Sequence, residues 1–324
     1  MQPLLQTRLL TGQLSWRRLL GFIVFWLLPV LPQQSQFLRQ LSNAEAASIK
    51  NVQRGTVTFT SGANRMAVTL SLAVDPSKTI VWGGISHGGG RFSTAGANAT
   101  RIAFDLESST TLALERLGSP ANSPVVEWQA VEFDSGVSVQ RGLRSMTTAE
   151  TTVNVTIPSS VDLNKSFVLV SVAPNSAGVN VDERWTIRSR LTTSTNLELS
   201  RNESGTAVDV YWQVIEMQGA SVQRGLTTIP SSSAAATAAI SSVDTSKSFL
   251  ILSSKAAAAV NGIESQYAFR GTITNSTLLT FSRVFYYEQR GCCVGSGVDG
   301  RRDVGPGGCP LDYGCYRHYF GSRH

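Results

Sequence analysis

The sequence predicts an all-β protein with three tandem antiparallel β-sandwich units, the third incomplete, after an N-terminal signal or anchor segment. The five residues SVQRG occur twice, at 138–142 and 221–225, and a close copy, NVQRG, begins at Asn51. Runs rich in β-branched residues, with partial alternation of apolar and polar side chains, follow each copy and indicate short strands. Further elements recur in the same order at a nearly constant period, which indicates repeated units.

The repeated elements divide the chain into five segments. Their expected bounds are 1–46 for a signal peptide or membrane anchor, 47–134 for unit 1, 135–218 for unit 2, 219–284 for an incomplete unit 3, and 285–324 for a tail rich in Cys, Gly and Arg. Units of about 84 residues with five or six strands are large enough to hold a core of their own. Each is therefore expected to be a small β-sandwich.

A Val-Asp-x-x-Lys element follows each VQRG copy after about 22 residues. It reads VDPSKTIV at Val74, VDLNKSFVLV at Val161 and VDTSKSFLIL at Val243. The Asp side chain can accept a hydrogen bond from the backbone two residues later, and the Lys can close the turn. This element is therefore expected to be a tight turn before a strand.

A strand with a Trp-Gln pair closes the first two units, as VVEWQAVEF and VDVYWQVIEM. Trp128 and Trp212 lie in alternating runs and are expected to fill matching places in the two cores. The Gly of VQRG is expected to end the first strand, at a bulge or a positive φ. For Arg54, Arg141 and Arg224 a structural role is favoured, and the alternative is a set of equivalent ligand or subunit contacts.

The N-terminal residues have the features of an export signal. Arg17 and Arg18 precede the apolar run LLGFIVFWLLPVL, whose length suits the hydrophobic region of a signal peptide. The sequence AEA at 44–46 fits a cleavage site with small residues, although the gap from the apolar run is long. An uncleaved anchor is the alternative. Both predict a secreted or cell-surface protein whose contact with a membrane is confined to this segment.

Unit 3 matches unit 2 as far as Ser282-Arg283, which align with Ser200-Arg201, and then no Trp-Gln strand follows. All four cysteines lie beyond this point, without the CxxC spacing of a zinc site. A disulfide or metal knot, a disordered tail and a shifted reading frame are the alternatives. In the shifted frame, codon degeneracy permits TTS-x-GAVVW, with Trp at position 294 as in the ESGTAVDVYW of unit 2. We favour the frameshift and expect unit 3 to lack its closing strand and to keep an open edge.

The body of the chain lacks the residues that most catalytic and metal sites need. His87 is its single histidine, no Gly-x-Ser-x-Gly sequence accompanies it, and no His or Cys cluster could hold a metal. The net charge of +6 is concentrated toward the N-terminus, and no Lys/Arg stripe suits nucleic acid. We therefore expect no enzyme activity, no catalytic residue, no metal site, no cofactor and no nucleic-acid partner.

The order of elements in unit 2 resembles the H-type lectin domain. This order is VQRG, TVNVTIPSSVD, KSFVLVSV, RWTIRSRL, TNLELSR and VYWQVIEM, and the likeness covers about residues 49–284. The resemblance implies six-stranded sandwiches that bind sugars, often as trimers. The loops where sugar contacts would lie, APNSAGVNVDER and SKAAAAVNGIES, differ between the units, so no ligand-binding residue is assigned.

Two functions are compatible with these features. The first, which we favour, is a secreted or surface-attached binding or adhesion module, with glycans as a candidate ligand class and avidity from its repeated units. The second is a structural surface, fibre or appendage protein that packs against copies of itself and takes no small ligand. Exposed edge strands with apolar faces would favour the second. A homo-oligomer is compatible with both.

Overall fold

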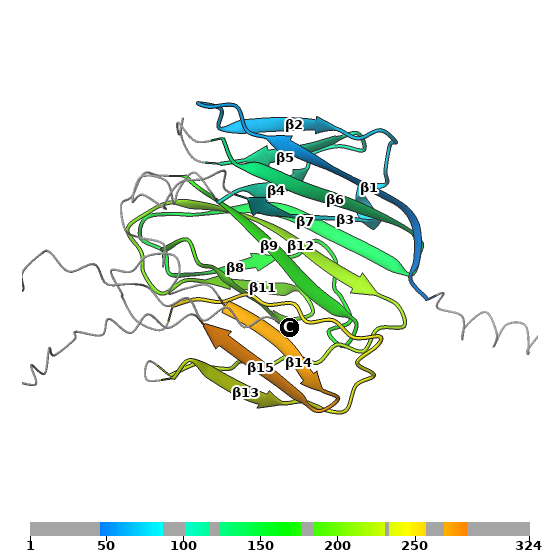
Figure 1. Ribbon diagram of the computed structural model, residues 1–324, viewed down its shortest axis with the longest axis vertical. Coiled ribbons are helices and arrows are strands. Elements are labelled where there is room, and N and C mark those ends of the chain that lie inside the picture. The colour runs from blue at the N-terminus through cyan, green and yellow to red at the C-terminus, as the bar shows by residue number, and fades with distance from the viewer. Residues whose placement is uncertain are drawn as a thin grey trace, which may run out of the picture. The chain divides into compact units, whose positions relative to one another are not determined.

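The computed structural model describes residues 46–86, 101–116, 123–175, 184–230, 233–256 and 269–283. All of them lie within Met1–Phe285, the first of two parts into which the chain divides. They form fifteen β-strands and one short 3-10 turn, η1 (Pro76–Lys78), and every pairing between strands is antiparallel (Figure 1). The predicted all-β class is thereby confirmed. The proposed tail at 285–324, the export segment up to residue 45, and His87 lie outside the described residues.

None of the helical structure in the described ranges is long and apolar enough to cross a membrane.

Unit 1 consists of two three-stranded sheets, each with one strand between two others. The first sheet has the order β1 (Ser48–Thr58), β6 (Val125–Ser135), β3 (Thr79–Ser86). The second has the order β2 (Arg65–Thr69), β5 (Thr111–Glu115), β4 (Ala103–Leu106). The closing strand β6, which carries Trp128, therefore holds the central position of the first sheet.

Unit 2 repeats this arrangement strand for strand. Its first sheet has the order β7 (Val137–Met146), β12 (Val208–Met217), β9 (Ser166–Pro174). Its second has the order β10 (Arg188–Thr193), β11 (Asn196–Ser200), β8 (Thr152–Thr156). β12, which carries Trp212, is again the central strand of its sheet.

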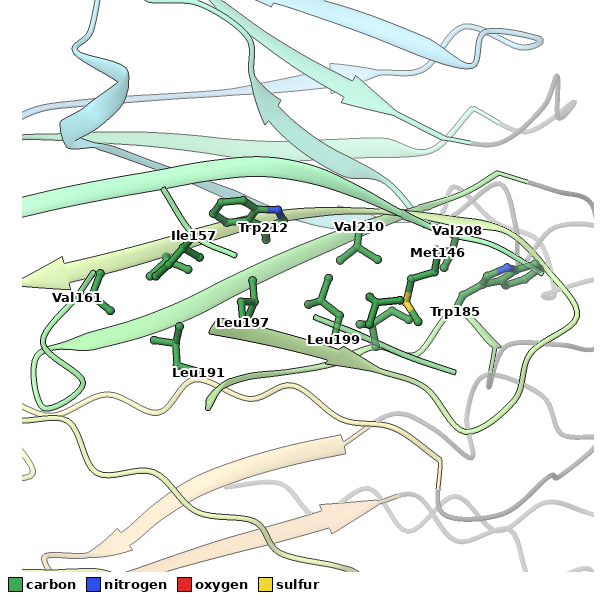
Figure 2. Packing of buried hydrophobic residues seen from close by; sticks show 13 residues of the cluster. Met146, Ile157, Val161, Trp185, Leu191, Leu197, Leu199, Val208, Val210 and Trp212 are labelled. Carbon is green, nitrogen blue, oxygen red and sulfur yellow. The ribbon is translucent and has the colours of Figure 1, made fainter. Parts of the chain in front are cut away.

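In units 1 and 2 the two sheets enclose an apolar core. In unit 2 the closing strand contributes Val210 and Trp212, which pack in one cluster with Leu197 and Leu199 of the other sheet (Figure 2). Val214 of the same strand belongs to this cluster as well. The corresponding core of unit 1 contains Trp128 with residues of both its sheets. Trp128 and Trp212 are only 7% and 5% exposed, so their predicted burial at matching positions is confirmed.

The Gly of VQRG has a different role from the one predicted. Gly55 and Gly142 lie inside β1 and β7, directly opposite Trp128 and Trp212, and neither has a positive φ. A Cβ at Gly55 would lie 2.8 Å from the Trp128 ring, and one at Gly142 would lie 2.6 Å from the Trp212 ring. The prediction of a bulge or strand end is therefore wrong. Glycine is required because the indole lies against the backbone of the neighbouring strand.

The Gln of VQRG fixes a distant loop in all three units. Its side-chain amide exchanges two hydrogen bonds with one backbone residue after the second strand. Gln53 bonds Leu72, Gln140 bonds Ser159 and Gln223 bonds Ser241, at 2.7–3.1 Å. Because each Gln satisfies both a backbone donor and a backbone acceptor, it ties the first strand to the segment before the Val-Asp-x-x-Lys turn.

The Val-Asp-x-x-Lys turn forms as predicted. The side chains of Asp75, Asp162 and Asp244 each accept a hydrogen bond from the backbone N–H two residues later, at 2.8–3.0 Å. The backbone N–H of each turn Lys donates to the carbonyl of the same Asp at 3.0 Å. In the first two units the closing strand also contacts the turn, because Glu132 and Glu216 accept from the N–H of Asp75 and Asp162.

An arginine, buried in units 1 and 2 and half-buried in unit 3, secures the loop between the first two strands of each unit. Arg116, Arg201 and Arg283 occupy matching positions and donate to backbone carbonyls of that loop. Arg201 also donates to the carbonyls of Arg184 and Thr206. A guanidinium has five N–H donors, so it can satisfy several carbonyls that would otherwise be left unpaired in the interior.

In unit 3 the structure describes only one sheet, with the order β13 (Ala235–Ala239), β15 (Leu278–Arg283), β14 (Phe269–Asn275). It corresponds to the second sheet of the other units. Segments 221–230 and 248–256 match the strands that flank β12, yet they form no strand ladder with any described residue. Among the described hydrophobic side chains from 219 onward, only Ala256 is buried.

Replacing Gly142 with Val should destabilise the protein by about 1–3 kcal/mol, the usual cost of overpacking a core. The added side chain would meet the Trp212 ring, which Val210 and Leu197 hold in place. The same change at Gly225, where a Cβ would meet nothing within 4 Å, should shift the free energy of unfolding by less than about 0.5 kcal/mol. Urea unfolding followed by tryptophan fluorescence measures both. Equal effects at the two sites would contradict the role assigned to this glycine.

Candidate functional site

The arginines of VQRG connect each unit to the one before it. Arg141 of unit 2 donates from Nη2 to the carbonyls of Pro76 and Thr79 in unit 1. Arg224 of unit 3 donates from Nη2 to the carbonyl of Ser166 in unit 2, at 3.2 Å. Thr79 and Ser166 are equivalent, since each directly follows the turn Lys. Arg141 and Arg224 therefore make equivalent contacts between consecutive units of one chain, which agrees with the structural role favoured for these arginines.

The guanidinium of Arg141 lies in a partly dehydrated place. Burial lowers the pKa of Arg141 to about 10, and the nearby carboxylate of Asp105 opposes this shift. Burial also lowers the pKa of Arg224, with Asp162 opposing. Both groups remain protonated at neutral pH, so each donates charge-assisted hydrogen bonds to the preceding unit.

A serine on the third strand makes a second repeated contact. The backbone N–H of Phe104 in unit 1 donates to the hydroxyl of Ser171 in unit 2, at 3.0 Å. The N–H of Ser189 in unit 2 donates to the hydroxyl of Ser253 in unit 3, also at 3.0 Å. Phe104 pairs with Leu114, two residues before Arg116, and Ser189 pairs with Leu199, two residues before Arg201. The two N–H donors therefore occupy equivalent register positions. The junction between units 1 and 2 thus recurs between units 2 and 3.

Gln213 joins the closing strand of unit 2 to the edge of unit 1. Its Nε2 donates to the carbonyl of Val81 at 2.7 Å, and its Oε1 accepts from the Val81 N–H at 3.0 Å. Both groups are buried. Val81 lies on β3, whose only partner among the described strands is β6. The side chain of Gln213 therefore satisfies backbone groups on the free side of this edge strand.

Apolar side chains complete the junction. Ile80, Val131 and Phe133 of unit 1 form one cluster with a set of residues from unit 2, which comprises Val137, Val139 and Ile215 with partly buried Phe167, Leu169 and Met217. Between units 2 and 3, the rings of Phe167 and Phe249 meet edge to face with centroids 5.7 Å apart. Ile80, Phe167 and Phe249 are equivalent, because each is the second residue after its turn Lys. The junctions therefore bring matching residues together.

Tyr211 and two acids add a polar group to the first junction. Tyr211 donates from its hydroxyl to Oε2 of Glu115 at 2.5 Å. Burial, together with this hydrogen bond, raises the pKa of Tyr211 well above its usual range. Burial, and to a lesser degree Glu107, raises the pKa of Asp105. The arrangement pairs a neutral donor with a carboxylate across the junction and acts as a structural contact.

Unit 1 has counterparts of the arginine, glutamine and apolar side chains that form the junctions. The described residues contain no unit before unit 1 for them to contact. Arg54, the counterpart of Arg141 and Arg224, is exposed, and Gln129, the counterpart of Gln213, is half-buried. Trp82 on the same sheet is 39% exposed. The arginine that units 2 and 3 place on the preceding unit, and the amide and apolar groups that unit 2 places there, thus have counterparts on unit 1.

Some residues that form the junctions recur in the sequence, but their recurrence alone did not reveal which residues they contact. The pairs KSFVLVS and KSFLILS show a serine at the same distance from the turn Lys, which gives Ser171 and Ser253. The Trp-Gln pair marked the closing strand, although the role of its Gln depends on the neighbouring unit. A repeated pattern shows which side chains recur from unit to unit. The residue that each one contacts in a neighbouring unit is seen only in the folded structure.

A scan of protein families, a search of curated proteins and a search of solved structures find no match to this chain.

Replacing Gln213 with Leu should weaken the junction by about 1–3 kcal/mol, since it leaves the buried N–H and C=O of Val81 without their partner. The same change at Gln129 should cost less than about 0.5 kcal/mol, because its counterpart contact is not made. Urea unfolding of the two variants gives the comparison. A loss at Gln129 as large as the loss at Gln213 would show that the amide serves its own sandwich and not the junction.

Proposed function

We propose that this chain is an exported, non-catalytic surface protein that works by recognition between β-sandwich units, as an adhesion or assembly module. The observation that carries the proposal is that the same arginine and serine contacts form at both junctions between consecutive units. Because units 2 and 3 use the same surface and the same contacts to bind the unit before them, this surface is suited to recognise other units of this type. Its export is inferred from the apolar N-terminal segment and follows from the sequence alone.

Exposed Arg54 in unit 1 and half-buried Ser248 in unit 3 extend this recognition to other copies. Unit 1 has the free donor Arg54, and unit 3 has Ser248, which follows its turn Lys as Thr79 and Ser166 follow theirs. The carbonyl of Ser248 is therefore the counterpart of the two carbonyls that accept from Arg141 and Arg224. A head-to-tail contact between copies would use the chemistry already present between units.

Glycan binding is a second candidate function. Units 1 and 2 share their strand order and their glutamine, Asp-turn and glycine–tryptophan contacts, whereas the sequences that follow the third strand, or its counterpart in unit 3, differ in each unit. They read HGGGRFSTAGANAT at 87–100, SAGVNVDE at 176–183 and AAAVNGIESQYA at 257–268. A constant framework with divergent loops is the usual organisation of a binding module. A glycan-array screen of the chain tests this function, and retention of no sugar would leave assembly as the function.

Replacing Arg54 with Ala should reduce self-association, because it removes the donor for the carbonyl of Ser248. Analytical ultracentrifugation over a concentration series should show oligomers of the natural chain and an apparent dissociation constant at least about tenfold weaker for the variant. Thr58→Ala is the matched control, since Thr58 is exposed on the same strand and its counterpart Ser145 bonds Asp209 within unit 2. A natural chain that stays monomeric throughout, or equal association of all three proteins, would refute the head-to-tail contact.

A further inference from the structure

We propose that unit 3 is a strand acceptor, which binds an extended segment of another protein between residues 221–230 and 248–256. The segment would follow the pattern that β6 and β12 share, apolar-x-Trp-Gln-apolar-x-Glu. Binding would add the central strand of a sheet, with backbone hydrogen bonds for affinity and side-chain positions for specificity. This inference rests on unit 3 alone and does not require the head-to-tail contact proposed above.

The two segments that would flank the strand are held at their places by contacts that do not involve it. Gln223 bonds the backbone of Ser241, and Arg224 donates to Ser166 of unit 2. On the other side, the Asp244 turn is formed and Ser253 bonds Ser189 of unit 2. The same contacts position β7 and β9 around β12 in unit 2. The acceptor is therefore arranged in advance, which lowers the entropic cost of binding.

The surface beside Gly225 leaves room for a tryptophan side chain. Gly225 is the counterpart of Gly55 and Gly142, which lie against the indoles of Trp128 and Trp212. A Cβ at Gly225 would meet nothing within 4 Å. Leu252, whose counterpart Val170 pairs with Trp212, is 43% exposed. An indole here would cover an apolar side chain and fill a space that glycine leaves open.

The outer side of the space fits the residues next to this tryptophan. Phe249 is 66% exposed, whereas its counterpart Phe167 pairs with Ile215 of β12 and is half-buried. Val168 on β9 is the counterpart of Val81, whose N–H and C=O bond Gln213 in the preceding junction. A glutamine after the tryptophan can therefore bond Val168 in the same way.

The acceptor also offers a backbone N–H donor for the glutamate of the pattern. The N–H of Asp75 and that of Asp162 each donate to a closing-strand glutamate, Glu132 or Glu216. The turn at Asp244 has the same geometry, and no described residue of unit 3 supplies the equivalent carboxylate. Three features of the pattern, the Trp, the Gln and the Glu, thus have matching places in the acceptor.

The partner is a different chain. Trp128 and Trp212 are buried in their own units, so a second copy could donate β6 or β12 only by opening a sandwich. In this chain the position eleven residues after Arg283, which corresponds to Trp212 after Arg201, is Val294, and Gly295 follows it in place of Gln. The pattern that the acceptor fits is therefore expected on an unpaired segment of another protein.

The probe is a labelled peptide with the sequence of residues 207–218, AVDVYWQVIEMQ, titrated with the full chain and followed by fluorescence anisotropy. We expect saturable binding of one peptide per chain. A peptide with Ala in place of its Trp should bind at least about tenfold more weakly, and Gly225→Val should weaken binding by a similar factor because the new side chain occupies the indole space.

Gly84→Val is the matched control, since a Cβ at Gly84 also meets nothing within 4 Å but lies in unit 1. Its affinity for the peptide should equal that of the natural chain, and so should that of Arg54→Ala, whatever the outcome for self-association. The proposal is overturned if the peptide does not bind, if Gly225→Val binds it as well as the natural chain, or if the peptide dissociates a dimer, which would make a second copy the occupant.

Discussion

The contact between a closing-strand tryptophan and a glycine on the neighbouring strand is the constraint on which each complete sandwich depends. Trp212 reaches the core only because Gly142 leaves the backbone of β7 bare at the position directly opposite. Its strand is also the central one of its sheet, so its two neighbours obtain their hydrogen bonds from it. One strand therefore provides the centre of the sheet, a core tryptophan and, through Glu216, a contact that fixes the turn.

The five residues SVQRG recur because three of them perform separate tasks, of which the glutamine's is seen in all three units. The glutamine ties the first strand to a loop of its own unit, the arginine contacts the preceding unit, and the glycine admits the tryptophan. Gln223 keeps its bonds in unit 3, and Arg224 keeps its contact with unit 2, whereas Gly225 faces an open space. The first two tasks are thus independent of the closing strand, and the third depends on it.

Much of the fold could be predicted from the sequence because its determinants are local. Alternating β-branched runs and the short-range bonds of the Asp turns involve residues close together in the chain, and these predictions are confirmed. The reason for the glycine in VQRG could not be found in this way. It depends on an indole about 70 residues away, and a glycine inside a strand looks the same as one at a bulge. The junction contacts were hidden for the same reason, since Ser171 and Gln213 have partners in another unit.

Hydrogen exchange at the backbone amides of units 2 and 3 tests the role of the closing strand most directly. Residues 137–146 and 166–174, which pair with β12, should exchange slowly, at rates set by opening of the whole unit. Residues 221–230 and 248–256 should exchange orders of magnitude faster, although they repeat the SVQRGL and Ser-Phe sequences of their counterparts in unit 2, because no described strand pairs with them. Equal protection of the matching segments in the two units would contradict the account.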